Sequence, residues 1–227
     1  MASLREQLKA HEARAKRART NIEKLRRALS HNRAILKAEQ IRAARVKKKL
    51  AGVGERKRAV RWALDAVGTV ESPPFSNKGP RITKWQEMSG YPGGGVPWCQ
   101  CFANVSAWFG MKARTELDCG NIGGYTVSVV DRAKRLSPIG GVTGWKSCRL
   151  SECQPGDWVY FKFSPGGDSV QHVGVFLEYN RAAGTVKCVE GNTSPGNGGS
   201  QDNGGGAFIR TRPTSVVAAC VKVPFKS

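Results

Sequence analysis

Long apolar runs are absent from this 227-residue chain. No stretch approaches the roughly 18–20 consecutive apolar residues that a membrane-spanning helix needs, so we expect no transmembrane segment. The first 30 residues are polar and charged, without the apolar core of a secretory signal peptide. We therefore expect synthesis in the cytoplasm, and a role outside the cell would require release by another protein.

Histidine is scarce as well, with three in the whole chain. His172 is the only one beyond residue 31, which leaves few nitrogen ligands for a metal. The sequence also has no Cys-x-x-Cys pair, the spacing typical of structural zinc sites. We expect no metal and no cofactor.

Acidic residues are outnumbered, because 37 Lys and Arg stand against 17 Asp and Glu, a net charge of +20. Residues 1–61 hold 20 basic and 5 acidic residues (+15), and residues 62–227 hold 17 and 12 (+5). We therefore predict a basic helical segment at 1–54 and a compact domain at 55–227. The basic segment favours anionic partners such as nucleic acid, anionic lipid or acidic wall polymers, although a merely solvated helix is equally open.

The basic segment has a helical pattern over residues 4–50. Apolar or small residues recur at alternating spacings of four and three, which is a heptad register, and neither Pro nor Gly interrupts it. Three positions of this seam are polar: His11, Asn32 and Glu39. We predict one long helix whose register suits a homodimeric coiled coil. Lys and Arg flank the seam and would repel a parallel copy, so a single helix stays open as well.

The second part predicts helices followed by strands. Helical periodicity covers residues 60–67, 82–88, 99–109 and 125–136, and strand-like alternation covers 158–163, 171–179, 185–190, 208–212 and 216–223. This order favours an α+β domain in which helices pack on one face of an antiparallel sheet.

Cys99 stands out as a candidate nucleophile. It follows Pro97 and Trp98 and begins a predicted helix, where unpaired N–H groups and the positive end of the helix dipole favour a thiolate. Such a thiolate needs a base, and His172 is the one histidine available in this domain. Cys101 lies about 200° farther around the helix, so we expect it to face away and pack inward.

The base needs an orienting partner on its second ring nitrogen. Glu190 and Asn192 end the strand predicted at 185–190 and lie two residues apart, so both side chains could point the same way. Either could accept a hydrogen bond from His172. The candidate catalytic residues are therefore Cys99, His172, Glu190 and Asn192.

Four segments resemble the CHAP family (cysteine, histidine-dependent amidohydrolase/peptidase), a branch of the papain-like, NlpC-type fold. They are Val-Pro-Trp-Cys at 96–99, Gly-Asp-Trp-Val-Tyr-Phe at 156–161, Gln-His-Val-Gly-Val at 171–175 and Val-Glu-Gly-Asn at 189–192. The resemblance covers roughly residues 60–225. It implies that Cys99 is the nucleophile, His172 the base, and Glu190 and Asn192 the polar residues beside the histidine. Some relatives bind calcium through closely spaced aspartates near the cysteine, and no such loop is visible here.

The resemblance implies a peptidoglycan hydrolase of the phage-endolysin type that cuts an amide bond of the cell wall. Both endopeptidase and N-acetylmuramoyl-L-alanine amidase activity stay open. Such an enzyme would be made in the host cytoplasm without a signal peptide and would reach the wall after holin-type release. The basic helix would be its candidate anchor on an anionic wall polymer or a membrane surface.

Two alternatives follow from the basic helix. The protein could be a virion-associated tail lysin whose coiled coil docks to a tail protein. It could also be a catalytically inactive relative that acts as a nucleic-acid-binding or scaffolding protein. The basic helix lacks the clustered aromatic residues expected for binding of single strands, so we predict no specific nucleic-acid partner.

Six cysteines remain beside Cys99. An even number would permit disulfides, and the spacing of Cys148 and Cys153 is compatible with a bridge across a loop. Six small, partly buried thiols are the alternative.

Overall fold

The computed structural model describes residues 4–49, 54–111, 145–163, 170–196, 199–201 and 203–226. Cys119 and the helix predicted at 125–136 lie outside these residues. The described elements are α1 (Leu4–Lys49), α2 (Glu55–Asp65), α3 (Pro80–Met88), α4 (Cys99–Gly110), β1 (Lys146–Cys148), β2 (Trp158–Phe161), β3 (His172–Asn180), β4 (Thr185–Thr193), β5 (Gly206–Pro213) and β6 (Val217–Lys222). Short 3-10 helices at Leu150–Glu152 and Thr214–Val216 precede β2 and β6.

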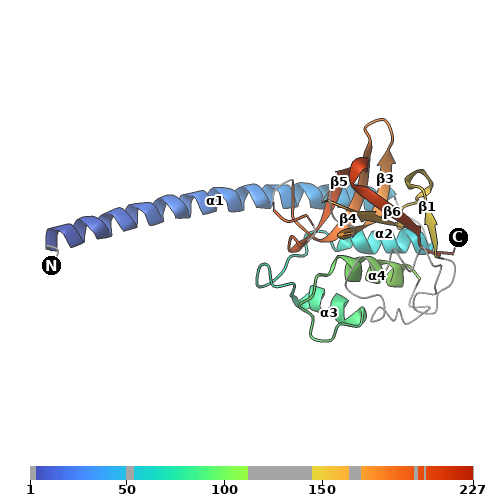
Figure 1. Cartoon of the computed structure of the whole chain (residues 1–227), viewed down its shortest axis with the longest axis horizontal. Coiled ribbons are helices and arrows are strands. Elements are labelled where there is room, and N and C mark those ends of the chain that lie inside the picture. The colour runs from blue at the N-terminus through green and yellow to red at the C-terminus, as the bar shows by residue number, and fades with distance from the viewer. Residues whose placement is uncertain are drawn as a thin grey trace. The chain divides into compact units, whose positions relative to one another are not determined.

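A single uninterrupted helix, α1, confirms the long helix predicted over residues 4–50 (Figure 1). The chain divides into two compact units, 1–38 and 39–227, so most of α1 forms a unit by itself. Within this unit the seam residues Leu25 and Leu29 are 69% and 51% exposed. The coiled coil and the domain boundary after residue 54 stay predictions.

Six antiparallel strands form one sheet in the order β1-β6-β2-β3-β4-β5. Strands β3 and β4 are consecutive and pair Val175 with Val189. On its other side β3 pairs with β2, from Trp158 opposite Val175 to Phe161 opposite His172. The α+β class is confirmed. Strand β1 is not among the predicted strands, because three residues carry too little alternation to be recognised.

Helices α2, α3 and α4 form a layer on one face of this sheet (Figure 1). Helix α4 contacts β3 and β4 directly, and α2 and α3 both contact α4. Almost every residue of α4 is buried, as expected of a helix in the middle of a domain. The core between the layers contains large aromatic side chains without solvent exposure, namely Trp98, Phe102, Trp158 and Tyr160.

Arg56 on α2 ties the helical layer to the start of β2. Its Nη1 lies 2.7 Å from Oδ1 of Asp157, and its guanidinium lies 5.1 Å from the ring centre of Phe225. Asp157 is fully buried and also accepts hydrogen bonds from the backbone N–H groups of Gln154 and Val223. Asp157 therefore has a structural role. Its carboxylate binds the turn at 154–157, the end of the sheet at Val223 and helix α2 to one another.

The opposite face of the sheet has a second, smaller apolar cluster. Its buried members alternate along the strands with the residues of the main core, and they are Val159, Phe161, Phe176, Val186, Cys188 and Cys220. Of the described helices, none is both long and apolar enough to cross a membrane.

Candidate functional site

Cys99 is the first residue of α4, at the position that the sequence predicts for the helix start. The N-cap residue is Trp98, and no side chain caps the helix, so the first-turn N–H groups keep their capacity to bind an anion. Cys99 is 2% exposed, and both His172 and Glu190 are fully buried. The site is thus shielded from bulk water, which strengthens electrostatic interactions within it.

The imidazole of His172 lies between Glu190 and Cys99. His172 begins β3, and Glu190 is in the neighbouring strand β4. The Nε2 atom of His172 lies 3.0 Å from Oε2 of Glu190, and the Cys99 sulfur is close enough to the same ring to shift its pKa. Neither contact has the alignment of an ideal hydrogen bond, so the Glu190 contact is best described as an ion pair. The rings of Phe161 and Phe163 flank the imidazole at centroid distances of 6.3 and 6.0 Å.

Opposing effects set the pKa of His172. Burial disfavours the imidazolium and lowers the pKa, whereas the Cys99 sulfur and the Glu190 carboxylate favour it. The two partners outweigh burial and raise the pKa to about 9. The ring is therefore protonated at neutral pH.

Glu190 stays ionised although it is buried. Burial raises its pKa, but His172 and Arg212 outweigh that effect and hold the pKa below its ordinary value. Arg212 on β5 binds the carboxylate with two hydrogen bonds, from Nε to Oε1 at 3.1 Å and from Nη2 to Oε2 at 2.6 Å. Oε2 of Glu190 is thus shared between Arg212 and His172.

Arg212 is itself held in place on several sides. Its Nη1 donates to Oε1 of Gln201 at 2.6 Å, and its Nη2 donates to Oγ1 of Thr193 at 3.1 Å. The guanidinium carbon lies 4.9 Å from the ring centre of Phe163. Sequence reasoning did not identify Arg212, because an arginine in a strand ordinarily faces solvent and no local spacing marks it as buried.

Two glycines let the elements of the site approach one another. A Cβ on Gly174 of β3 would lie 2.7 Å from Cβ of Cys188 and 2.9 Å from Cγ of Glu190. A Cβ on Gly191 of β4 would lie 2.6 Å from Cβ of Phe102 on α4. Both glycines belong to the motifs that surround His172 and Glu190, and close packing explains their presence there.

Asn192 is fully buried two residues after Glu190. Its backbone has a φ of 58°, and the register between β4 and β5 shifts between Glu190 and Thr193. The simple alternation assumed from the sequence therefore breaks at Asn192. Its Nδ2 donates to Oδ1 of Asn203 at 3.1 Å, which ties the end of β4 to the following loop. A role for Asn192 in orienting His172 stays a prediction.

Cys101, two residues after Cys99 in α4, is also buried. Burial raises the pKa of Cys101 to about 12, so this thiol stays protonated at neutral pH. Gln100 accepts a hydrogen bond from the Tyr160 hydroxyl at 3.2 Å. Burial, followed by the nearby Cys99, also raises the pKa of Tyr160, which therefore remains a neutral donor.

A buried hydrogen bond fixes Trp98, the residue that precedes Cys99. The indole Nε1 of Trp98 donates to Oε1 of Glu71 at 2.9 Å, and Oε2 of Glu71 accepts from the backbone N–H of Asn77. Gln86 on α3 holds the adjacent loops together by donating to the carbonyls of Asn77 and Val96. The loop at 71–79 thus acts as a support for the start of α4.

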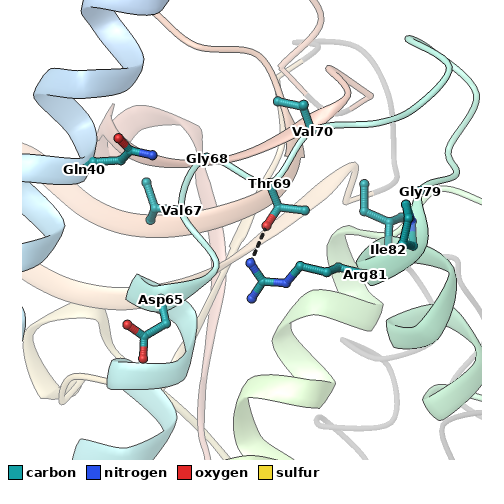
Figure 2. Close-up of a pocket in the computed structure, with 10 residues that line it drawn as sticks. Gln40, Asp65, Val67, Gly68, Thr69, Val70, Gly79, Arg81 and Ile82 are labelled. Carbon is teal, nitrogen blue, oxygen red and sulfur yellow. Dashed lines mark hydrogen bonds between the residues drawn. The ribbon is translucent and has the colours of Figure 1, made fainter.

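A separate cavity of about 500 Å³ lies at the two ends of the loop at 71–79 (Figure 2). Its lining includes Asp65, Thr69, Val70 and Arg81, and none of the four candidate catalytic residues. Figure 2 shows Arg81 directed toward Thr69, and the Nη1–Oγ1 distance is 3.1 Å. The described residues contain no group of three or more His, Cys, Asp or Glu side chains that could hold a metal ion.

No family model matches the chain, and no curated protein matches it. Among solved structures, the chain is similar to the crystal structure of a wild type endolysin LysIME-EF1, with 20% sequence identity and a TM-score of 0.34. The match covers 45% of this chain and 45% of the endolysin chain.

Proposed function

We propose that this protein is a cysteine-dependent hydrolase that cuts an amide bond of peptidoglycan. The observation that carries the proposal is the contact of one buried imidazole, His172, with both the Cys99 thiol and the Glu190 carboxylate. A thiol, an imidazole and a carboxylate in this order form the arrangement that nucleophilic catalysis requires. The four sequence segments that resemble the CHAP family contain these three residues, and they direct the proposal toward wall amides.

In the proposed reaction, the Cys99 sulfur, as a thiolate paired with the His172 imidazolium, attacks the carbonyl carbon of the amide. A C–S bond forms, and the carbonyl oxygen becomes an oxyanion that the N–H groups at the start of α4 stabilise. The imidazolium of His172 gives its proton to the leaving amine, and the C–N bond breaks. His172 then takes a proton from water, which attacks the thioester, and the C–S bond breaks to release the acid and Cys99.

Glu190 supports both stages of this cycle. Its carboxylate stabilises the imidazolium before the amine leaves and again during hydrolysis of the thioester. It faces Nε2 of His172, which leaves Nδ1 as the nitrogen that exchanges protons with Cys99 and the substrate. Arg212 keeps the carboxylate ionised and oriented.

The basic helix α1 is the proposed anchor on the wall or membrane surface. Residues 1–38 contain 11 basic and 3 acidic residues, a net charge of +8. Wall polymers and membrane surfaces are anionic, so electrostatic attraction would concentrate the enzyme at its substrate. The exposed seam of α1 would also suit a homodimer. As an endolysin, the protein would act after release from the host cytoplasm.

A lysis assay with two cysteine variants tests the proposed function. We expect purified peptidoglycan to lose turbidity with the wild-type protein and with Cys101→Ala, and to stay turbid with Cys99→Ala. Cys101 is the matched control because it is a buried thiol of the same helix. Equal clearing by Cys99→Ala and wild type would contradict the role of Cys99. Mass spectrometry of the released fragments distinguishes an amidase from an endopeptidase.

A further inference from the structure

Three thiols that have no part in the proposed reaction lie together in the smaller apolar cluster of the sheet. Cys148 ends β1 and is paired in register with Cys220 of β6. Cys153 follows the 3-10 helix Leu150–Glu152, and its Sγ lies 3.7 Å from Sγ of Cys148. Cys220 is a further hydrogen-bonding partner of Cys153. The proposed hydrolysis makes no use of these three thiols.

Solvent access distinguishes two members of this cluster from the other thiols. Cys148 and Cys153 are partly exposed. The remaining cysteines that the structure describes are all buried, and they are Cys99, Cys101, Cys188 and Cys220. A small soluble oxidant therefore reaches Cys148 and Cys153 first, and these are the two whose sulfurs are already in contact.

We propose that Cys148 and Cys153 are an oxidisable pair that closes to an intramolecular disulfide in the presence of a disulfide oxidant such as oxidised glutathione. One cysteine, as its thiolate, attacks the oxidant to form a mixed disulfide and releases one glutathione thiolate. The other cysteine attacks the protein sulfur of the mixed disulfide and releases the second glutathione. The protein gives up two electrons and two protons, and the oxidant becomes two thiols.

The local structure prepares the pair for this closure. A disulfide needs a sulfur–sulfur distance of about 2.05 Å, so the two sulfurs, now 3.7 Å apart, have to approach by less than about 2 Å. The intervening turn is fixed by Arg149 and Glu152, because the Arg149 backbone N–H donates to Oε2 of Glu152 at 2.9 Å and their side chains form an ion pair. The crosslink would join the edge strand β1 to the turn that leads into β2.

The reaction should be slow near neutral pH and faster in alkaline solution. Burial, followed by the neighbouring Cys153 thiol, raises the pKa of Cys148 to about 12. The hydrogen bond to Cys220, followed by burial, raises the pKa of Cys153 above its ordinary range. Because the thiolate is the attacking species, few molecules are reactive at pH 7 and more become so as the pH rises.

Peptide mapping of the full-length protein tests this proposal without an activity assay. The reduced protein is treated with oxidised glutathione at alkaline pH, remaining thiols are blocked, and the denatured chain is digested with trypsin without reduction. Cleavage after Lys146, Arg149 and Lys162 places Cys148 in peptide 147–149 and Cys153 in peptide 150–162. We expect these two peptides to be the main disulfide-linked pair, with a loss of two hydrogen atoms per intact molecule.

Two variants sharpen the test. Cys220→Ser is the matched control, since it removes a thiol of the same cluster and should keep the 147–149 to 150–162 link. Cys148→Ser should abolish the link and leave Cys153 free or carrying glutathione. A dominant link between Cys153 and Cys220 in the wild type, or glutathione adducts without any internal disulfide, would overturn the proposal. Neither result would affect the role proposed for Cys99, because the readout is covalent and local.

Discussion

The protonation of His172 couples the candidate site to the stability of the fold. Its pKa is raised from 6.5 to about 9 by Cys99 and Glu190 against the effect of burial. The folded state therefore binds this proton more tightly than the unfolded chain does. The corresponding stability is fully present below about pH 6.5 and is lost as the pH rises through the folded-state pKa.

We predict that the free energy of unfolding falls between pH 6.5 and 9, by up to about 3 kcal/mol. Urea unfolding at a series of pH values measures this change. In the His172→Gln variant the same pH interval should show no such decrease, because the titrating group is absent. A wild-type stability that is flat across this interval would refute the raised pKa.

Arg212 offers a second test at the level of one residue. In Arg212→Gln, the buried Glu190 loses the cation that binds both of its oxygens, and only His172 and the Coulomb attraction of Arg210 remain, so we expect a loss of about 3–5 kcal/mol of stability and a strong loss of activity. Arg212→Lys keeps the charge but not the two-point contact, and its losses should be smaller. Arg210→Gln is the control, because Arg210 shares the Gln201 contact without hydrogen bonding to Glu190. Equal effects at both arginines would contradict the positioning role.

The sequence was sufficient to nominate Cys99, His172 and Glu190 but not Arg212. The cysteine is marked by its place at a helix start, and the histidine by being alone in its domain. Glu190 follows from its place on a strand in a recognisable motif. Arg212 lies 22 residues farther along and contacts Glu190 only because β5 pairs with β4, a contact that no local pattern encodes.

At the level of elements, the position of α4 against β4 depends on Gly191. A Cβ there would lie within 2.7 Å of both Phe102 and Trp98, and the two aromatic side chains lie in a packed core. Because interiors are close-packed, the helix rather than the side chains would have to move.

We therefore predict that Gly191→Ala destabilises the protein by about 1–3 kcal/mol and reduces hydrolysis, since Cys99 moves with α4. Thermal unfolding and the peptidoglycan assay give the two measurements. Gly54→Ala is the matched control, because a Cβ at Gly54 would meet nothing within 4 Å. Comparable losses in both variants would show that packing of α4 is not the cause.

Elements with strong periodicity were predictable, and their ends were not. Helix α4 and strands β3 to β6 lie close to the predicted ranges. The regular spacing of their apolar residues indicates the type of element, and turn-forming residues on either side indicate where it stops. Strand β4 runs on to Thr193, three residues beyond the predicted range, because pairing with β5 resumes after a register shift. That extension depends on a partner strand and is invisible to a local pattern.

At the scale of the whole molecule, the two compact units divide within α1. Glu39, at the start of the second unit, is buried, whereas most described side chains of the first unit are exposed. We therefore expect a truncation that removes residues 1–38 to retain the buried Glu39 and to leave the sheet and helices α2 to α4 folded.

We predict that the truncated chain 39–227 binds purified cell walls several-fold more weakly than the full chain, while its turnover of a small soluble substrate is unchanged. Co-sedimentation with walls measures binding, and the difference should shrink in high salt as the charges of α1 are screened. A parallel loss of binding and turnover would show that α1 is part of the catalytic fold.

The sequence by itself determined the α+β class and the long basic helix, and it nominated Cys99 and His172 as candidate nucleophile and base, because periodicity, charge and scarce residue types are local properties. Only the tertiary structure decided the rest. It brought Arg212 to Glu190, placed the imidazole of His172 between carboxylate and thiol, and set Cys148 beside Cys153. The first two contacts depend on the pairing of β4 with its neighbouring strands, and the third depends on the turn between Cys148 and Cys153. Local sequence patterns do not encode such contacts, because they depend on how the whole chain packs.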